Sequence, residues 1–460
     1  MLGRSAFINL IASYVALPAV PMVFDGLERS YSPQVIRGDL DAIWSTLIEV
    51  GVEPFRTSDR STVEAIYRQV RAAIASPMSL REAWLAISPV LGALNDGHVG
   101  LGFPSGFREA LYQFPLGFAL SADGMLIVAS DHTGTVPIGS RIVSIQGVSA
   151  ADYREATLRD FGGQTPTLHR ERVAMAGAWT AVALFGARSA YDVRWVTPQG
   201  AEAEGEIPAA LPRGGVSAAP YAFNMLSSGT VGYIDYRSCE DLPQFNAFLE
   251  TTFAQMRAAS TRALIIDIRR NGGGDSKLND LLWTYAQSKP FKQFGGIISK
   301  SCARLKGEYG EEKYVRIYGE EAWNAPDGTI LTSGTDPAAD LVVPGPLDIR
   351  FSGPVYLLIS ADTFSSAMSC ALAAKDYGLA TIVGEETGEP VNTTGELYTE
   401  ITPGLGLRAY LTTKVFLAPR PHPNNQGVVP DVPVPTTYAD QSAHRDPVLE
   451  KTLAMISASH

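Results

Sequence analysis

The chain has 460 residues, of which 45% are hydrophobic and 18% are charged, a composition typical of a globular protein with ample apolar material for a large core. The formal net charge is -11, and an acidic surface repels phosphate backbones, so nucleic acid is not an expected partner. The three cysteines, Cys239, Cys302 and Cys370, lack metal-ligand or C-x-x-C spacing. We expect buried, inert thiols, with one disulfide between two of them left open.

Residues 1–30 form the first predicted segment. Arg4 precedes a mostly apolar stretch from Ala6 to Phe24, which predicts a signal peptide or a short membrane anchor. No clean A-x-A cleavage site is present, and a helix packed on the domain is the alternative. With export or anchoring the protein would be periplasmic, secreted or membrane-anchored, and otherwise cytoplasmic.

Residues 31–108 are predicted to form an N-terminal helical domain. Apolar side chains recur at helical spacing over Asp39–Val52 and over Thr62–Ala75. Ser79-Leu-Arg-Glu is a capping box that opens a third helix running towards Leu94. Asn95-Asp-Gly-His98 then breaks the helical pattern, and the residues after it alternate as a strand does.

Residues 109–215 are predicted to be β-rich. Strand candidates are Met125–Ala129, Arg141–Ile145 and Tyr191–Val196. The segment Gly139–Gly147 resembles the G-D-x-I-x-x-I-N-G segment of PDZ domains, which would bind a peptide C-terminus along a strand edge. A plain β-rich insert remains the alternative.

Residues 216–460 alternate strand and helix and are predicted to form an α/β catalytic domain. The expected order is strand 231–236, helix 242–258, strand 263–268, strand 355–360, helix 365–377 and strand 380–383. This rhythm predicts a mainly parallel sheet with flanking helices.

Ser365 follows an apolar strand and a tight turn and opens a helix. Chemistry in α/β folds collects at the carboxyl ends of strands, and a helix N-terminus favours developing negative charge. Ser365 is therefore a candidate nucleophile. The simpler interpretation is that Ser365 or Ser366 only caps the helix.

A glycine turn, Arg269-Arg-Asn-Gly-Gly-Gly-Asp275, follows the buried strand that ends at Ile268. Glycines let a backbone approach a ligand closely. The turn can form an oxyanion hole in which the N–H groups of Gly273 and Ser366 face one carbonyl oxygen. A flexible turn is the alternative, and no Lys-Ser/Thr follows at the spacing of a phosphate-binding loop.

A serine hydroxyl needs a base, and the chain offers six histidines. His98 alone lies in a sharp Asn-Asp-Gly-His turn between a helix and a strand, which makes it the candidate base. The scattered histidines contain no H-E-x-x-H pair, so a metalloprotease is not expected.

In chain order, these segments resemble the motifs of the C-terminal processing (tail-specific) and tricorn-like serine peptidase family over about residues 36–435. The segments that carry the likeness are Leu94-Asn-Asp-Gly-His-Val-Gly-Leu, Leu264-Ile-Ile-Asp-Ile-Arg-Arg-Asn-Gly-Gly-Gly, Thr363-Phe-Ser-Ser-Ala, Val383-Gly-Glu-Glu-Thr-Gly, Asn392-Thr-Thr-Gly-Glu and Gly427-Val-Val-Pro-Asp. The resemblance implies a core of the ClpP/crotonase type, Ser365 as nucleophile, His98 as base, and oxyanion donors near Gly273 and Ser366. It requires no metal or organic cofactor.

Two departures concern the base and the group that supports it. Tail-specific members use a lysine as base about 25 residues after the serine, where this chain has Pro390, so a Ser–Lys dyad is not expected and His98 must serve as base. Tricorn-like members place a glutamate just before G-V-x-P-D, where this chain has Asn424-Asn-Gln426. The sequence therefore predicts a Ser-His dyad supported by Asn424 or Gln426, or by another acid such as Asp96 or Glu396, and reduced or lost activity remains open.

The expected function is a serine endopeptidase or peptide-processing hydrolase that acts through an acyl-enzyme on a peptide or protein substrate. The same machinery would serve an esterase or lactonase. A non-catalytic lipid- or peptide-binding protein of the same fold is the third alternative.

Overall fold

The computed structural model describes residues 26–107, 114–121, 124–210, 219–336, 340–423, 425–437, 439–440 and 445–458. The apolar stretch of the predicted signal peptide or anchor lies outside these residues, so the leader and the localisation stay predictions. Within the described ranges, no helix combines the length and hydrophobicity needed to cross a membrane.

The three predicted N-terminal helices are present as α2 (Pro33–Val50), α3 (Arg60–Ala73) and α4 (Leu80–Gly92). Each begins at a capping side chain that accepts a backbone N–H, as short polar residues do at helix N-termini. The capping box predicted at Ser79 forms both of its hydrogen bonds with Glu82. A short antiparallel pair, β1 (Ser30–Tyr31) with β2 (Met78–Ser79), lies beside these helices.

The following region contains an antiparallel sheet in the order β4-β5-β6-β8-β9, with β7 paired to β6. Its strands are β4 (Leu116–Leu120), β5 (Leu126–Asp131), β6 (Arg141–Ile145), β7 (Val148–Ser149), β8 (Ala190–Val196) and β9 (Glu202–Pro208). The segment that resembles a PDZ motif forms β6 and the tight turn into β7, in which Gln146 and Gly147 both have positive φ angles of 50° and 77°. That this region is a PDZ domain stays a prediction.

Two helices in this region, α6 (Ala150–Phe161) and α7 (Pro166–Phe185), were not predicted, so the region combines the expected strands with two long helices. Thr165 caps α7 and Pro166 occupies its first turn, which are ordinary helix-start signals. The buried side of α7 consists largely of alanine, glycine and threonine together with Arg172. Such a side has little hydrophobic periodicity, which explains why the pattern did not reveal the helix.

The α/β part contains a six-stranded sheet in the order β10-β11-β12-β15-β16-β19. Its strands are β10 (Tyr221–Leu226), β11 (Val231–Tyr236), β12 (Ala263–Asp267), β15 (Val355–Ile359), β16 (Thr381–Gly384) and β19 (Val432–Pro433). All neighbours are parallel except the β10–β11 pair.

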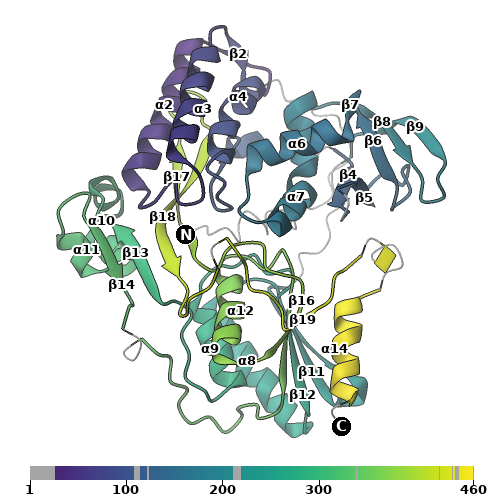
Figure 1. Ribbon diagram of the computed structural model, residues 1–460, viewed down its shortest axis with the longest axis vertical. Helices are drawn as coiled ribbons and strands as arrows, with labels where there is room; N and C mark the ends of the chain where they lie inside the picture. Colours follow the sequence, from purple (N-terminus) through teal and green to yellow (C-terminus); the bar gives the residue numbers. More distant parts are fainter. Residues whose placement is uncertain are drawn as a thin grey trace.

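Helices cover both faces of this sheet (Figure 1). One face packs against α8 (Leu242–Ala258), α9 (Lys277–Ala286) and α12 (Ser366–Tyr377), and the other packs against α14 (Pro447–Ala458). The predicted mainly parallel sheet with flanking helices is therefore confirmed, whereas its particular likeness to ClpP and crotonase stays a prediction.

A third sheet connects the two parts of the molecule. It has the order β14-β13-β18-β17, and β3 (Gly100–Gly102) also pairs with β18. The other strands are β13 (Gly296–Lys300), β14 (Ile330–Ser333), β17 (Thr393–Ile401) and β18 (Arg408–Leu417), and α10 (Ala303–Tyr318) and α11 (Glu320–Asn324) lie beside β13 and β14 (Figure 1).

The long β17–β18 hairpin extends from the α/β part to the N-terminal helices (Figure 1). Leu405, Leu407 and Leu411 of this hairpin join one apolar cluster with Trp84 of α4 and Phe118 of β4. The segments predicted as separate domains, 31–108 and 109–215, thus share one hydrophobic cluster with the hairpin. This shared packing fixes β3, and with it the turn that carries His98, above the α/β sheet.

Candidate active site

Ser365 lies between the carboxyl end of β15 and the first residue of α12. Its φ and ψ angles are 55° and -126°, a region that residues with a side chain rarely adopt and that is common at functional sites. Its side chain makes no capping hydrogen bond to α12. The hydroxyl Oγ lies instead 3.1 Å from His98 Nε2, so the simple capping interpretation does not describe this serine.

His98 lies in the turn between α4 and β3 and is only 2% exposed. One ring nitrogen, Nε2, faces Ser365, and the other, Nδ1, lies 3.3 Å from Glu389 Oε2. The ring also packs against Phe364, with 4.7 Å between ring centroids. Both ring nitrogens therefore lie close to polar groups from distant parts of the chain.

Glu389 is completely buried in the connection between β16 and β17. Its Oε1 accepts the backbone N–H of Ser365 at 2.5 Å, and its Oε2 accepts the hydroxyl of Thr393 at 3.0 Å. The same carboxylate thus contacts the nucleophile turn and the His98 ring. A carboxylate at Nδ1 can orient an imidazole and stabilise its protonated form.

Sequence analysis did not single out Glu389. It lies 24 residues after Ser365, next to the position at which a lysine was sought. The sequence feature that could have identified Glu389 is an acidic residue at this spacing from the serine, between Gly388 and Pro390.

The residues expected to support His98 are placed differently. Asp96 lies behind the turn, where its Oδ1 accepts the backbone N–H of His98 at 2.7 Å and its Oδ2 accepts the Thr394 hydroxyl at 2.6 Å. Asp96 therefore shapes the turn rather than contacting the imidazole. Glu396 faces Lys414 Nζ at 3.4 Å, and the contact of Gln426 is made by its backbone carbonyl, which accepts the N–H of Val391. Asn424 lies outside the described residues.

The glycine turn lies directly against the nucleophile. At Gly273, which has φ 98°, an added Cβ would lie 2.7 Å from the Cβ of Ser365, so only glycine fits. The N–H of Gly273 donates to Asn271 Oδ1 at 2.9 Å, so this predicted oxyanion donor is engaged within its own turn.

Ser366 is the second predicted oxyanion donor. It is the first residue of α12, so the helix supplies no acceptor for its N–H. Its hydroxyl donates to the Gly274 carbonyl at 2.6 Å, and its own carbonyl accepts from Asn279 Nδ2 at 2.7 Å. These contacts hold the start of α12 against the glycine turn, with the positive end of the helix dipole beside Ser365.

The three cysteines are buried free thiols, as expected. Burial raises the pKa of Cys239 to about 12, and it raises the pKa values of Cys302 and Cys370. Their thiolate forms are therefore disfavoured, and the thiols are poor nucleophiles.

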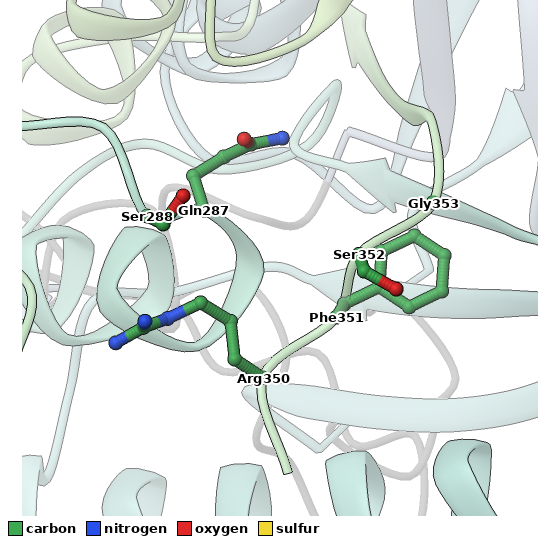
Figure 2. Close-up of a pocket in the computed structure, with 6 residues that line it drawn as sticks. All are labelled: Gln287, Ser288, Arg350, Phe351, Ser352 and Gly353. Atoms are coloured by element: carbon green, nitrogen blue, oxygen red, sulfur yellow. The ribbon is translucent and has the colours of Figure 1, made fainter. Parts of the chain in front are cut away.

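A recess of about 330 Å³ lies elsewhere on the α/β part, between Gln287 and Ser288 after α9 and the Arg350–Gly353 segment that leads into β15 (Figure 2). It is at the amino end of β15, whereas Ser365 follows the carboxyl end. This recess is therefore separate from the Ser365 site.

Comparisons with known proteins give a family match for part of the chain and similar solved structures for its fold. Residues 230–434 match the model of peptidase family S41, a range that includes Ser365 and Glu389 but not His98. No curated protein sequence matches the chain. The crystal structure of mature CPAF is similar with a TM-score of 0.62 and 16% identity over 89% of this chain and 94% of that chain.

Two further solved structures are similar to this chain. Mature CPAF complexed with lactacystin has a TM-score of 0.62 and 16% identity over 92% of this chain and 98% of that chain. The photosystem II D1 C-terminal processing protease has a TM-score of 0.43 and 15% identity over 87% of this chain and 93% of that chain. At these identities the CPAF structures show the fold alone, and the family rests on the matched segment. The matched segment, residues 230–434, is therefore similar to the serine peptidases of family S41.

Proposed function

We propose that this protein hydrolyses peptide bonds in peptide or protein substrates through an acyl-enzyme formed on Ser365, with His98 as general base and Glu389 as the orienting carboxylate. The observation that carries the proposal is the line of contacts from Glu389 Oε2 to His98 Nδ1, 3.3 Å, and from His98 Nε2 to Ser365 Oγ, 3.1 Å. Three segments far apart in the sequence meet here with the order of groups that activates a serine hydroxyl.

In the first half of the reaction, Ser365 Oγ attacks the scissile carbonyl carbon while its proton moves to His98 Nε2. The tetrahedral intermediate collapses when the imidazolium returns this proton to the leaving amine, leaving an ester on Ser365. Water then attacks the ester with the same base, and the carboxylic acid product leaves. His98 becomes an imidazolium once during acylation and once during deacylation, and the Glu389 carboxylate offsets its positive charge each time.

The carbonyl oxygen needs donors while it carries negative charge. The Ser366 N–H at the start of α12 is one donor that the resting structure offers. The N–H of Gly273 becomes a second donor when it exchanges Asn271 Oδ1 for the substrate oxygen. Such an exchange replaces one hydrogen bond by another on the same N–H.

A buried carboxylate at Glu389 favours a catalytic site over a non-catalytic binding protein. Burying a charged group is costly unless it is hydrogen-bonded or paired, and a binding protein has no need for one directed at an imidazole. The same contact favours a Ser-His-Glu triad over a Ser-His dyad with amide support.

The test is covalent labelling of the purified full chain with a fluorophosphonate probe, with the adduct mapped by mass spectrometry. Ser365→Ala and His98→Ala are run in parallel, and circular dichroism checks that each is folded. We expect a label on Ser365 in the wild-type chain and none in either variant. Folded wild-type protein that takes up no label would contradict the proposal, and a labelled Ser365 would lead to a peptide library as the next step.

A further inference from the structure

Arg172 is a buried cation on α7, a helix that the proposed mechanism does not use. Its side chain is only 5% exposed, although arginine is almost never buried without partners. Its Nη2 donates to the backbone carbonyl of Gly97, the residue immediately before His98. The guanidinium therefore contacts the turn that carries the proposed base.

The charges of three carboxylates act on this guanidinium. Burial lowers the pKa of Arg172 to about 10, while the charges of Asp96, Glu389 and Asp362 oppose that decrease. Arg172 thus remains a cation at neutral pH, and its charge interacts with those of Glu389, which lies near His98, and of Asp96, which shapes the His98 turn.

Two other charged residues, Arg170 and Glu171, directly precede Arg172 on the same helix. Burial and the adjacent Asp362 carboxyl raise the pKa of Glu171 well above its ordinary value, with the Glu385 charge adding to the effect. The Arg170 side chain is 38% exposed, and its Nη2 lies 3.9 Å from Glu385 Oε1. Arg172 differs from Arg170 in being enclosed, so solvent screens its charge far less.

The beginning of α7 also contacts both turns of the candidate triad. The cap residue Thr165 donates its hydroxyl to the carbonyl of Gly388, next to Glu389, at 2.8 Å. Gln164 accepts the N–H of Gly97 at 3.0 Å. The side chain of Leu168 packs against Gly97 and Gly388. A Cβ added at Gly97 would lie 3.0 Å from it, and one added at Gly388 would lie 3.2 Å from it.

We propose that Arg172 is a positioning residue of this active site: it holds the Gly97–His98 turn and offsets the buried negative charge of Glu389, so that His98 stays neutral and able to accept the serine proton. The inference rests on the proposed function of Ser365 and His98. Its physical basis is that a buried cation near an acid–imidazole pair disfavours a second positive charge on the imidazole. It also favours the ionised form of the acid.

The first experiment is the pH dependence of fluorophosphonate labelling of Ser365. We expect the labelling rate of Ser365 to fall at low pH as His98 becomes protonated, and we call this part of the pH profile the acid limb. Loss of the Arg172 charge in Arg172→Gln should move the acid limb to higher pH by about one unit, so that the labelling rate at a given pH on the limb falls about tenfold. Arg172→Lys keeps the charge without the planar guanidinium, and we expect a lower plateau with the limb near its wild-type position. The matched control is Arg170→Gln, which removes an exposed charge from the same helix and leaves the limb unchanged.

The second experiment does not depend on activity. Carbon-13 histidine labelling and an NMR titration give the pKa of the His98 ring in wild-type protein and in Arg172→Gln, with His98→Asn assigning the signal. We expect the variant to titrate about one unit higher. An unchanged His98 titration in folded Arg172→Gln would overturn the role of Arg172, even if labelling weakens. Absence of labelling in wild-type protein would overturn the proposed function, and the NMR shift would still decide the electrostatic role.

Discussion

Replacing Glu389 by glutamine is the sharpest test of the candidate triad. Both carboxylate oxygens act as acceptors, Oε1 for the Ser365 N–H and Oε2 for the Thr393 hydroxyl, and Oε2 also lies 3.3 Å from His98 Nδ1. A carboxamide has one acceptor oxygen, so its NH₂ group must face one of these donors. The substitution also removes the negative charge 3.3 Å from His98 Nδ1.

We expect the second-order rate of fluorophosphonate labelling at Ser365 to fall by about 10³–10⁴-fold, the loss found when a triad acid becomes an amide. This fall corresponds to about 4–5.5 kcal/mol of activation free energy. Some reactivity should remain, because the Ser366 N–H and the start of α12 are unchanged. The assay is intact-mass spectrometry of timed samples at several probe concentrations.

The matched control is Glu396→Gln, the acid that the sequence offered but that faces Lys414. We expect its labelling rate to stay within about twofold of wild type, since it alters only a peripheral ion pair. A folded Glu389→Gln protein that labels within about tenfold of wild type would refute the role of Glu389 as the orienting acid.

Three further predictions concern the surroundings of the site. Gly273→Ala should slow the labelling of Ser365 at least about tenfold, because the new Cβ would lie 2.7 Å from the Cβ of Ser365 and residue 273 has a φ of 98°. A wild-type labelling rate would show that the glycine turn can accommodate a side chain. Asp96→Asn keeps an acceptor for the His98 N–H, so the rate should fall by about tenfold or less, and a thousandfold loss would mean that Asp96 acts on the imidazole itself. Burial raises the pKa of Glu171 above its unfolded value, so its contribution to stability is complete at acidic pH and is lost as pH rises through the folded pKa. In thermal denaturation, the melting temperature of Glu171→Gln minus that of wild type should therefore increase by a few degrees as the pH is raised from 4.5 to 8. A difference that does not change with pH would contradict this.

Much of the fold followed from local sequence pattern. The capping box at Ser79, the buried run of β12 and the glycine C-cap at Gly378, which adopts the left-handed conformation, are each encoded within a few neighbouring residues. The helix α7 was missed because its buried side consists largely of small residues together with Arg172. Its burial comes from contact with β4, α4 and α6, which no local pattern contains.

The sequence by itself determined the strand–turn–helix setting of Ser365, the glycine turn beside it and the sharp turn at His98. It also carries the likeness of residues 230–434 to peptidase family S41. Only the tertiary structure decided which acid reaches His98. Parallel strand order brings the connection after β16 beside that after β15, and the β17–β18 hairpin carries β3 above them. Backbone turns and helix caps depend on neighbours in the chain, whereas a contact among residues 98, 365 and 389 depends on how distant strands pair and pack.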